Sequence, residues 1–233
     1  MLMLAIDTST KVLSLALVRY VNEEHELLGH VDEQTQNNQS EILMSRIEQL
    51  LQECGVTPAD LDRIGVAVGP GSYTGVRVGV TAAKSLGYAL GIPVTPVSSL
   101  QVMIWVESDA DVRVPMMDAR RGTVFAAAYY AWGDLIVPEG HYEIEAFIEK
   151  VLVTTGHDQI AFIGDGALAH KERLVSISPK WVEVHAEEAL SSGKAEAVAF
   201  YTAFEEEFPP LANTHDLKPN YLRKTEAEMN AGV

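Results

Sequence analysis

The sequence predicts an α/β protein of two lobes, each with a mixed sheet flanked by helices. Three apolar segments open the chain with the pattern of antiparallel strands. From about residue 40 onward, predicted helices alternate with buried strands, which is typical of α/β folds. A second series of strands begins at Val112 and its first strand ends in Asp118, just as the first strand of the chain ends in Asp7. We place the boundary at the polar segment that begins with Asp109, which gives lobes of 1–108 and 109–233.

The first lobe is expected to form a short antiparallel sheet before its first helix. We predict strands at residues 3–7, 12–18, 27–31, 66–68 and 92–97, and helices at 40–54, about 73–91 and 100–106. Ser40 is the predicted N-cap of the first helix. Its core-facing stripe contains Leu43, Ile47, Leu50, Leu51 and Cys54. Ile42 and Met44 lie outside this stripe and indicate a second edge that faces a partner.

A strand, a tight turn and a helix are predicted around Gly69-Pro70-Gly71. Ser72 or Thr74 caps the helix, and amides near the turn could hold an anion at the positive helix end. The glycine spacing fits neither the dinucleotide-binding nor the Walker pattern. In the alternative interpretation, which we favour, the glycines serve packing, because Gly75 and Gly79 lie four residues apart on one helix face.

The second lobe is expected to repeat the α/β pattern. We predict strands at 112–118, 124–132 and 160–163, helices at 144–153 and 168–174, and a closing helix at about 187–208. Pro209-Pro210 ends the closing helix, which we expect to pack back on the first lobe.

Composition excludes several classes of function. The 233 residues carry a net charge of -16, which argues against binding nucleic acid by this chain alone. Cys54 is the only cysteine, which excludes internal disulfides and agrees with a reducing cytoplasm. No apolar run is long enough to span a membrane, and we expect neither secretion by a standard signal nor a membrane segment.

Candidate catalytic groups are few. Asp7, followed by Thr8, Ser9 and Thr10, fits either a metal or phosphate site or an Asx turn that closes a hairpin. Asp118 with Arg120 and Arg121 fits an anion clamp or, as we favour, an ion pair. The seven histidines form no helical pair, so a histidine metal site is not expected. Gly71 to Gly75 places its serine wrongly for a nucleophile elbow.

These motifs together resemble the TsaB (YeaZ) family, bacterial proteins of tRNA threonylcarbamoyladenosine synthesis. The resemblance runs nearly end to end and is carried by residues 4–9, 40–43, 69–79, 118–120, 164–167 and 221–223. The most specific block is Gly-Pro-Gly-Ser-aromatic-Thr-Gly-x-Arg-x-Gly. It implies two ribonuclease-H-like lobes of the actin/hexokinase-like ATPase superfamily and a close relationship to TsaD, the catalytic subunit.

The resemblance also implies that this chain is not itself an enzyme. TsaD holds a metal with two histidines, and the corresponding positions here are Ser99 and Met103, which do not suit a hard metal. The family binds TsaD, or a second TsaB chain, through its first two helices. The expected interface residues are Ile42, Met44, Gly75, Gly79 and Ala83.

The resemblance therefore implies a cytoplasmic scaffold without a cofactor or metal, which positions TsaD for threonylcarbamoyl transfer to tRNA adenosine. TsaE joins the assembly, and tRNA is contacted only through the complex. A vestigial phosphate site is then expected at Asp7, Thr8, Ser9, Gly69, Gly71, Ser72 and Thr74. The alternative is an active small-molecule kinase or ATPase of the same fold; a protease fits least, because no catalytic set is present.

Overall fold

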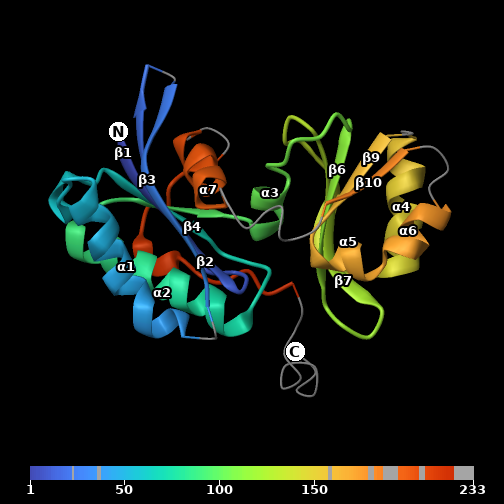
Figure 1. Ribbon diagram of the computed structural model, residues 1–233, viewed down its shortest axis with the longest axis horizontal. Coiled ribbons are helices and arrows are strands. Elements are labelled where there is room, and N and C mark those ends of the chain that lie inside the picture. Colours follow the sequence, from blue (N-terminus) through green and yellow to red (C-terminus); the bar gives the residue numbers. More distant parts are fainter. Residues whose placement is uncertain are drawn as a thin grey trace. The chain divides into compact units, whose positions relative to one another are not determined.

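The computed structural model describes residues 1–22, 24–35, 38–156, 159–177, 181–185, 194–204 and 208–222 (Figure 1). The chain divides into two compact units. Unit 1 contains Met1–Val102 and Ser191–Asn220, and unit 2 contains Met103–Leu190 and Tyr221–Val233. The chain thus passes into unit 2 at residue 103 rather than at 109, and a late segment returns to unit 1.

The sheet of unit 1 has five strands in the order β3-β2-β1-β4-β5. Its strands are β1 (Leu2–Asp7), β2 (Val12–Val21), β3 (Glu24–Gln34), β4 (Arg63–Ala67) and β5 (Val94–Val97). The first three strands are antiparallel, as predicted, and β4 and β5 add in parallel beyond β1. The sheet is therefore mixed, with β1 at its centre.

Helices cover both faces of this sheet (Figure 1). On one face, α1 (Gln39–Glu53) and α2 (Tyr73–Leu90) pack against a core that contains Leu4 and Ile6 of β1. On the other face, α7 (Lys194–Ala203) packs against Met3 and Ala5 of the same strand. Alternate residues of β1 thus enter opposite cores, because successive side chains of a strand point to opposite faces.

Three short helical segments complete unit 1, and several helix boundaries differ from prediction, including that of α3 (Ser99–Met103), predicted at 100–106. The segments are α3, whose last residue is assigned to unit 2, η1 (Pro58–Asp60) and η3 (Thr214–Asp216). Asn38 is the N-cap of α1, so the predicted cap, Ser40, lies inside the first turn. Of the predicted closing helix, α7 is observed, whereas 187–193 and 205–207 lie outside the described residues.

The sheet of unit 2 repeats the topology of unit 1. Its order is β10-β9-β6-β7-β8, with β6 at the centre, antiparallel to β7 and parallel to β9. The strands are β6 (Val112–Asp118), β7 (Thr123–Tyr130), β8 (Leu135–Glu143), β9 (Gln159–Ile163) and β10 (Trp181–His185). The helices are α4 (Ile144–Thr155), α5 (Asp165–Ala169) and α6 (Lys171–Ile177). This shared topology confirms two ribonuclease-H-like lobes, while β8 and β10 were not predicted.

In the described part of the chain, no helix combines the length and apolar character that crossing a membrane requires.

Candidate functional site

The Gly-Pro-Gly turn is held against neighbouring segments of unit 1. The amide of Gly69 donates to Ser99 Oγ at 3.0 Å, and the amide of Ser99 donates to Gly69 O at 3.0 Å. The amide of Ser72 donates to Ser9 O at 2.7 Å. A Cβ on Gly71, which has a φ of +156°, would overlap the Ser9 carbonyl. Two hydrogen bonds therefore join Ser99 to this turn. Ser99 is one of the two positions that the family resemblance aligns with the metal-binding histidines of TsaD.

The start of α2 packs closely on the end of β1. Ser72 caps the helix, since its Oγ accepts from the amide of Gly75 at 3.2 Å. Thr8 Oγ1 donates to Gly75 O at 2.7 Å. A Cβ on Gly75 would overlap the Thr8 carbonyl, and a Cβ on Gly79 would overlap Thr8 Oγ1. The packing interpretation of these glycines is thus confirmed.

The predicted phosphate residues do come together, and several of their polar groups bond within the chain, whereas the buried Ser9 Oγ has no hydrogen-bond partner among the described residues. Asp7 is 2% exposed, and its Oδ1 accepts from the amide of Ser9 at 2.7 Å, as in an Asx turn. The amides of Ser72 and Gly75 both donate within the chain. The vestigial phosphate role of this region stays a prediction.

Part of the predicted interface is wrong. Gly75, Gly79 and Ala83 are buried inside unit 1, where the helix side that carries them faces the sheet. The spacing of small residues identified a close helix contact correctly, but that contact is made within the chain. Ile42 is half-buried against the core, and Met44 is 50% exposed.

An open groove lies between α1 and α2. Its volume is about 630 Å³. It is lined by Ser40, Leu43, Met44, Tyr73, Thr74, Arg77, Val78, Thr81, Ala82 and Ser85. We call it the α1–α2 groove. Tyr73 is 50% exposed, and the Arg77 guanidinium stacks over its ring at 4.2 Å from the centroid.

Tyr73 and Arg77 line this groove but were not among the residues predicted for the interface. The available signal was their i, i+4 spacing on the side of α2 opposite the glycines, continued by Thr81 and Ser85.

Two further cavities adjoin this groove. A polar pocket of about 340 Å³ shares Ser40, Thr74 and Val78 with it and adds Thr10, Lys11, Thr35, Gln39, Ser72 and Gly75. We call it the N-terminal pocket. A cavity of about 620 Å³ on the other side of α1 shares Met44. Met44 therefore separates two concave, partly apolar surfaces.

The second predicted acid, Asp118, contacts backbone groups in unit 2. Its Oδ1 accepts from the amide of Arg120 at 2.8 Å, and its own amide donates to Asp165 Oδ1 at 3.1 Å. Arg120 and Arg121 both have positive φ values, 66° and 54°. This carboxylate thus shapes the turn between β6 and β7. Within the described ranges, no group of three or more His, Cys, Asp or Glu residues is placed to hold a metal ion.

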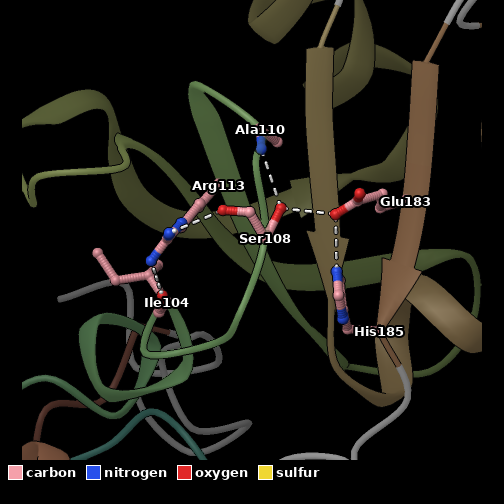
Figure 2. Close-up of polar contacts among 6 residues, drawn as sticks. All are labelled: Ile104, Ser108, Ala110, Arg113, Glu183 and His185. Atoms are coloured by element: carbon pink, nitrogen blue, oxygen red, sulfur yellow. Dashed lines mark hydrogen bonds and ion pairs between the residues drawn. The ribbon is translucent and has the colours of Figure 1, made fainter.

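A second polar cluster in unit 2 joins β10 to the chain segment that precedes β6 (Figure 2). Ser108 Oγ donates to Glu183 Oε2 at 2.6 Å, and His185 Nε2 lies 3.0 Å from the same oxygen. Arg113 Nη1 donates to Ile104 O at 2.7 Å. The hydrogen bond from Ser108, followed by that from His185, lowers the pKa of Glu183. The cluster therefore anchors a connecting segment.

Comparison with known proteins identifies the class. Residues 12–231 match a family model described as TsaD: tRNA N6-adenosine threonylcarbamoyltransferase. Together with the repeated sheet topology, this match defines a two-lobed α/β protein related to TsaD.

Individual relatives narrow the assignment. The tRNA threonylcarbamoyladenosine biosynthesis protein TsaB of Bacillus subtilis (strain 168) is 34% identical over 234 residues, covering 98% of this chain and 96% of that protein. TsaB of Escherichia coli (strain K12) is 34% identical over 134 residues, 55% of each chain. The structure of YeaZ from Pseudomonas aeruginosa superposes with a TM-score of 0.71 at 25% identity, covering 95% of this chain and 99% of that one. The chain belongs to the TsaB (YeaZ) family.

Proposed function

We propose that this chain is a non-catalytic subunit that binds TsaD and positions it for transfer of a threonylcarbamoyl group to adenosine in tRNA. Family membership supports a role in threonylcarbamoyladenosine synthesis, since relatives that match this chain carry that name. The match to a TsaD model supports TsaD as the partner. We further propose that the assembly is cytoplasmic, that TsaE joins it, and that tRNA is contacted only through the complex.

The observation that carries this proposal is the open α1–α2 groove. Leu43, Met44 and Tyr73 give it apolar surface, and half of the surface of Met44 and of Tyr73 remains exposed to solvent. Large exposed apolar side chains gathered in a concave surface are typical of protein-binding sites. We therefore assign partner binding to Met44, to Tyr73 and to the part of Ile42 that is exposed to solvent. A second copy of the chain, using the same face, would form the homodimer.

The alternative, an active kinase or ATPase, has less support. Asp7 is buried and its carboxylate accepts a hydrogen bond from the Ser9 amide. The amide of Gly69 donates to Ser99 Oγ, and the amide of Ser72, just after the turn, donates to Ser9 O. A kinase that used Asp7 would lose magnesium-dependent nucleotide binding in Asp7→Ala, whereas TsaD binding would be retained.

Size-exclusion chromatography with light scattering tests the scaffold proposal. The chain mixed with TsaD from the same source should give a new species at the summed mass of the two chains. Met44→Glu places a charge on the apolar border between the groove and the neighbouring cavity and should weaken the complex about tenfold, because a carboxylate would be desolvated there. Val153→Glu is the matched control, since Val153 is 80% exposed on α4 of unit 2.

Two results would count against the proposal. Separate peaks for the wild-type chain and TsaD, with ATP and magnesium present, would reject the scaffold role. A complex that tolerates Met44→Glu as well as Val153→Glu would keep TsaD as partner but reject the α1–α2 groove as the contact surface.

A further inference from the structure

The turn between β7 and β8 holds an exposed aromatic side chain in a fixed orientation. Trp132 is 69% exposed, and its ring stacks on that of Tyr130 with 4.5 Å between the centroids and 6° between the planes. The indole Nε1 donates to Asp134 Oδ2 at 2.7 Å. Two backbone hydrogen bonds of 2.9 Å close the turn, from the amide of Tyr130 to Asp134 O and from the amide of Gly133 to Tyr130 O. One face of the indole is therefore covered by Tyr130, and its orientation is set within the turn.

Acidic residues from two segments of unit 2 gather at this turn. The amide of Ala131 donates to Asp111 O at 2.9 Å, which brings the segment before β6 alongside the turn. Residues 107–112 and 130–135 contain no Lys, Arg or His. Their four acids are Glu107, Asp109, Asp111 and Asp134. In the described part of the chain, none of these four carboxylates takes part in an ion pair.

The indole face and the carboxylate at its edge together favour a cation as ligand. The face of an aromatic ring is negative, and it attracts a guanidinium or ammonium group within about 6 Å of the ring centroid. Asp134 uses Oδ2 for the indole, and within the described residues its Oδ1 accepts no hydrogen bond. An anionic ligand such as the phosphate backbone of RNA would be repelled by the four carboxylates.

The exposure of the site favours a side chain of a protein over a free cation. A site for a small molecule encloses most of its ligand, whereas most of the Trp132 surface is open to solvent. A side chain carried by a protein needs no such enclosure, because the surrounding surface of that protein excludes water. Arginine fits better than lysine, since its planar guanidinium stacks on a ring while its edge donates two hydrogen bonds to a carboxylate.

We propose that the turn between β7 and β8 is a protein-binding site, at which an arginine of a partner protein stacks on the open face of Trp132 and pairs with Asp134. The neighbouring carboxylates, including Asp111, would speed the approach of a basic segment. The site lies in unit 2, whereas the α1–α2 groove belongs to unit 1. The inference therefore goes beyond the proposed function and does not depend on it.

The test measures binding of the full chain to a dye-labelled peptide of alternating glycine and arginine, by fluorescence anisotropy at low salt. We expect a Kd on the order of 1 mM. The same peptide with neutral citrulline in place of arginine should bind at least tenfold more weakly. NMR spectra of the ¹⁵N-labelled chain, in which each of the three tryptophans gives an indole N–H signal, should show the largest shift for Trp132.

Two substitutions test the two halves of the site. Trp132→Leu should weaken peptide binding about five- to tenfold, because the aromatic face is lost. Asp134→Asn keeps an acceptor for the indole but removes the charge, and it should weaken binding about two- to fivefold at low salt and less at high salt. The matched controls on α4 are Val153→Ala, which trims an exposed apolar side chain, and Glu149→Gln, which removes an exposed charge. Thermal unfolding of each variant confirms that the fold is retained.

Three results would overturn the inference. The first is equal binding of the arginine and citrulline peptides. The second is a peptide affinity of Trp132→Leu and Asp134→Asn that matches the affinity of the control variants, since binding would then reflect the net charge of the chain alone. The third is displacement of the peptide by an equal concentration of spermidine, because the site would then accept any free cation. Failure of the chain to bind TsaD would reject the proposed function and leave this inference standing.

Discussion

Gly79 illustrates how one residue determines the packing of a helix on a sheet. Its missing side chain leaves room for Thr8, which lies at the carboxyl side of β1 and also bonds to Gly75 O. Gly79→Leu should lower the free energy of unfolding by about 3 kcal/mol or more, since overpacking displaces both elements. Urea denaturation measures this, with Ala89→Leu as the control because Ala89 is exposed on the same helix. Equal stability of the two variants would reject this contact.

Glu183 gives a prediction about pH. Its pKa is lowered from the usual 4.5, first by the hydrogen bond from Ser108 and then by that from His185. A depressed pKa means that the ionised group stabilises the folded state above its unfolded pKa, and that this stabilisation is lost as the pH falls through the folded pKa. Glu183→Gln should therefore reduce stability by about 1 kcal/mol at pH 7, with a smaller difference near pH 3.

Glu149→Gln, on α4, is the control for Glu183→Gln because it removes the same charge from an exposed position. Chemical denaturation at several pH values compares the two variants. A difference between Glu183→Gln and the wild type that stayed constant down to pH 3 would mean that ionisation of Glu183 does not carry the stabilisation.

Helices and strands could be predicted where a local sequence pattern determines them. Helix α2 was found with both of its ends because Ser72 caps its start and Gly91 ends it with a φ of 67°. Strand β8 was missed because Pro138 and Gly140 interrupt its pattern, although both are tolerated in a strand at the sheet edge.

The role of the small residues on α2 was only partly predictable for a related reason. Small residues at helical spacing indicate a close contact but not which element makes it, and here Thr8 of the same chain fills the space. The partner of such a helix face can therefore be assigned only from the tertiary structure, when it comes from a segment that is distant in sequence. Met44 departs from the apolar stripe of its own helix and is 50% exposed, and its role in partner binding stays a prediction.

In the molecule as a whole, the return of the chain to unit 1 at α7 is the feature that local sequence patterns predict least. Ala195, Ala197 and Val198 are buried against the sheet, and Lys194 Nζ donates to Thr10 Oγ1 at 3.1 Å. The amide of Ala195 donates to Ser14 Oγ at 3.1 Å. These contacts join segments about 180 residues apart in sequence. Unit 1 is therefore complete only when the late segment of the chain is present.

A truncation tests this dependence. Ending the chain after residue 190 would expose the sheet face that contains Met3, Ala5 and Ala16, which α7 covers in the full chain. We expect unit 1 to lose its cooperative thermal transition and the chain to bind more of a hydrophobic dye, since burial of apolar surface is the main stabilising contribution to a domain. Ending the chain after Leu222 keeps α7 and should preserve both properties. A cooperative transition of unit 1 in the shorter chain, separate from that of unit 2, would mean that β1 to β5, with α1 and α2, form a stable domain unaided.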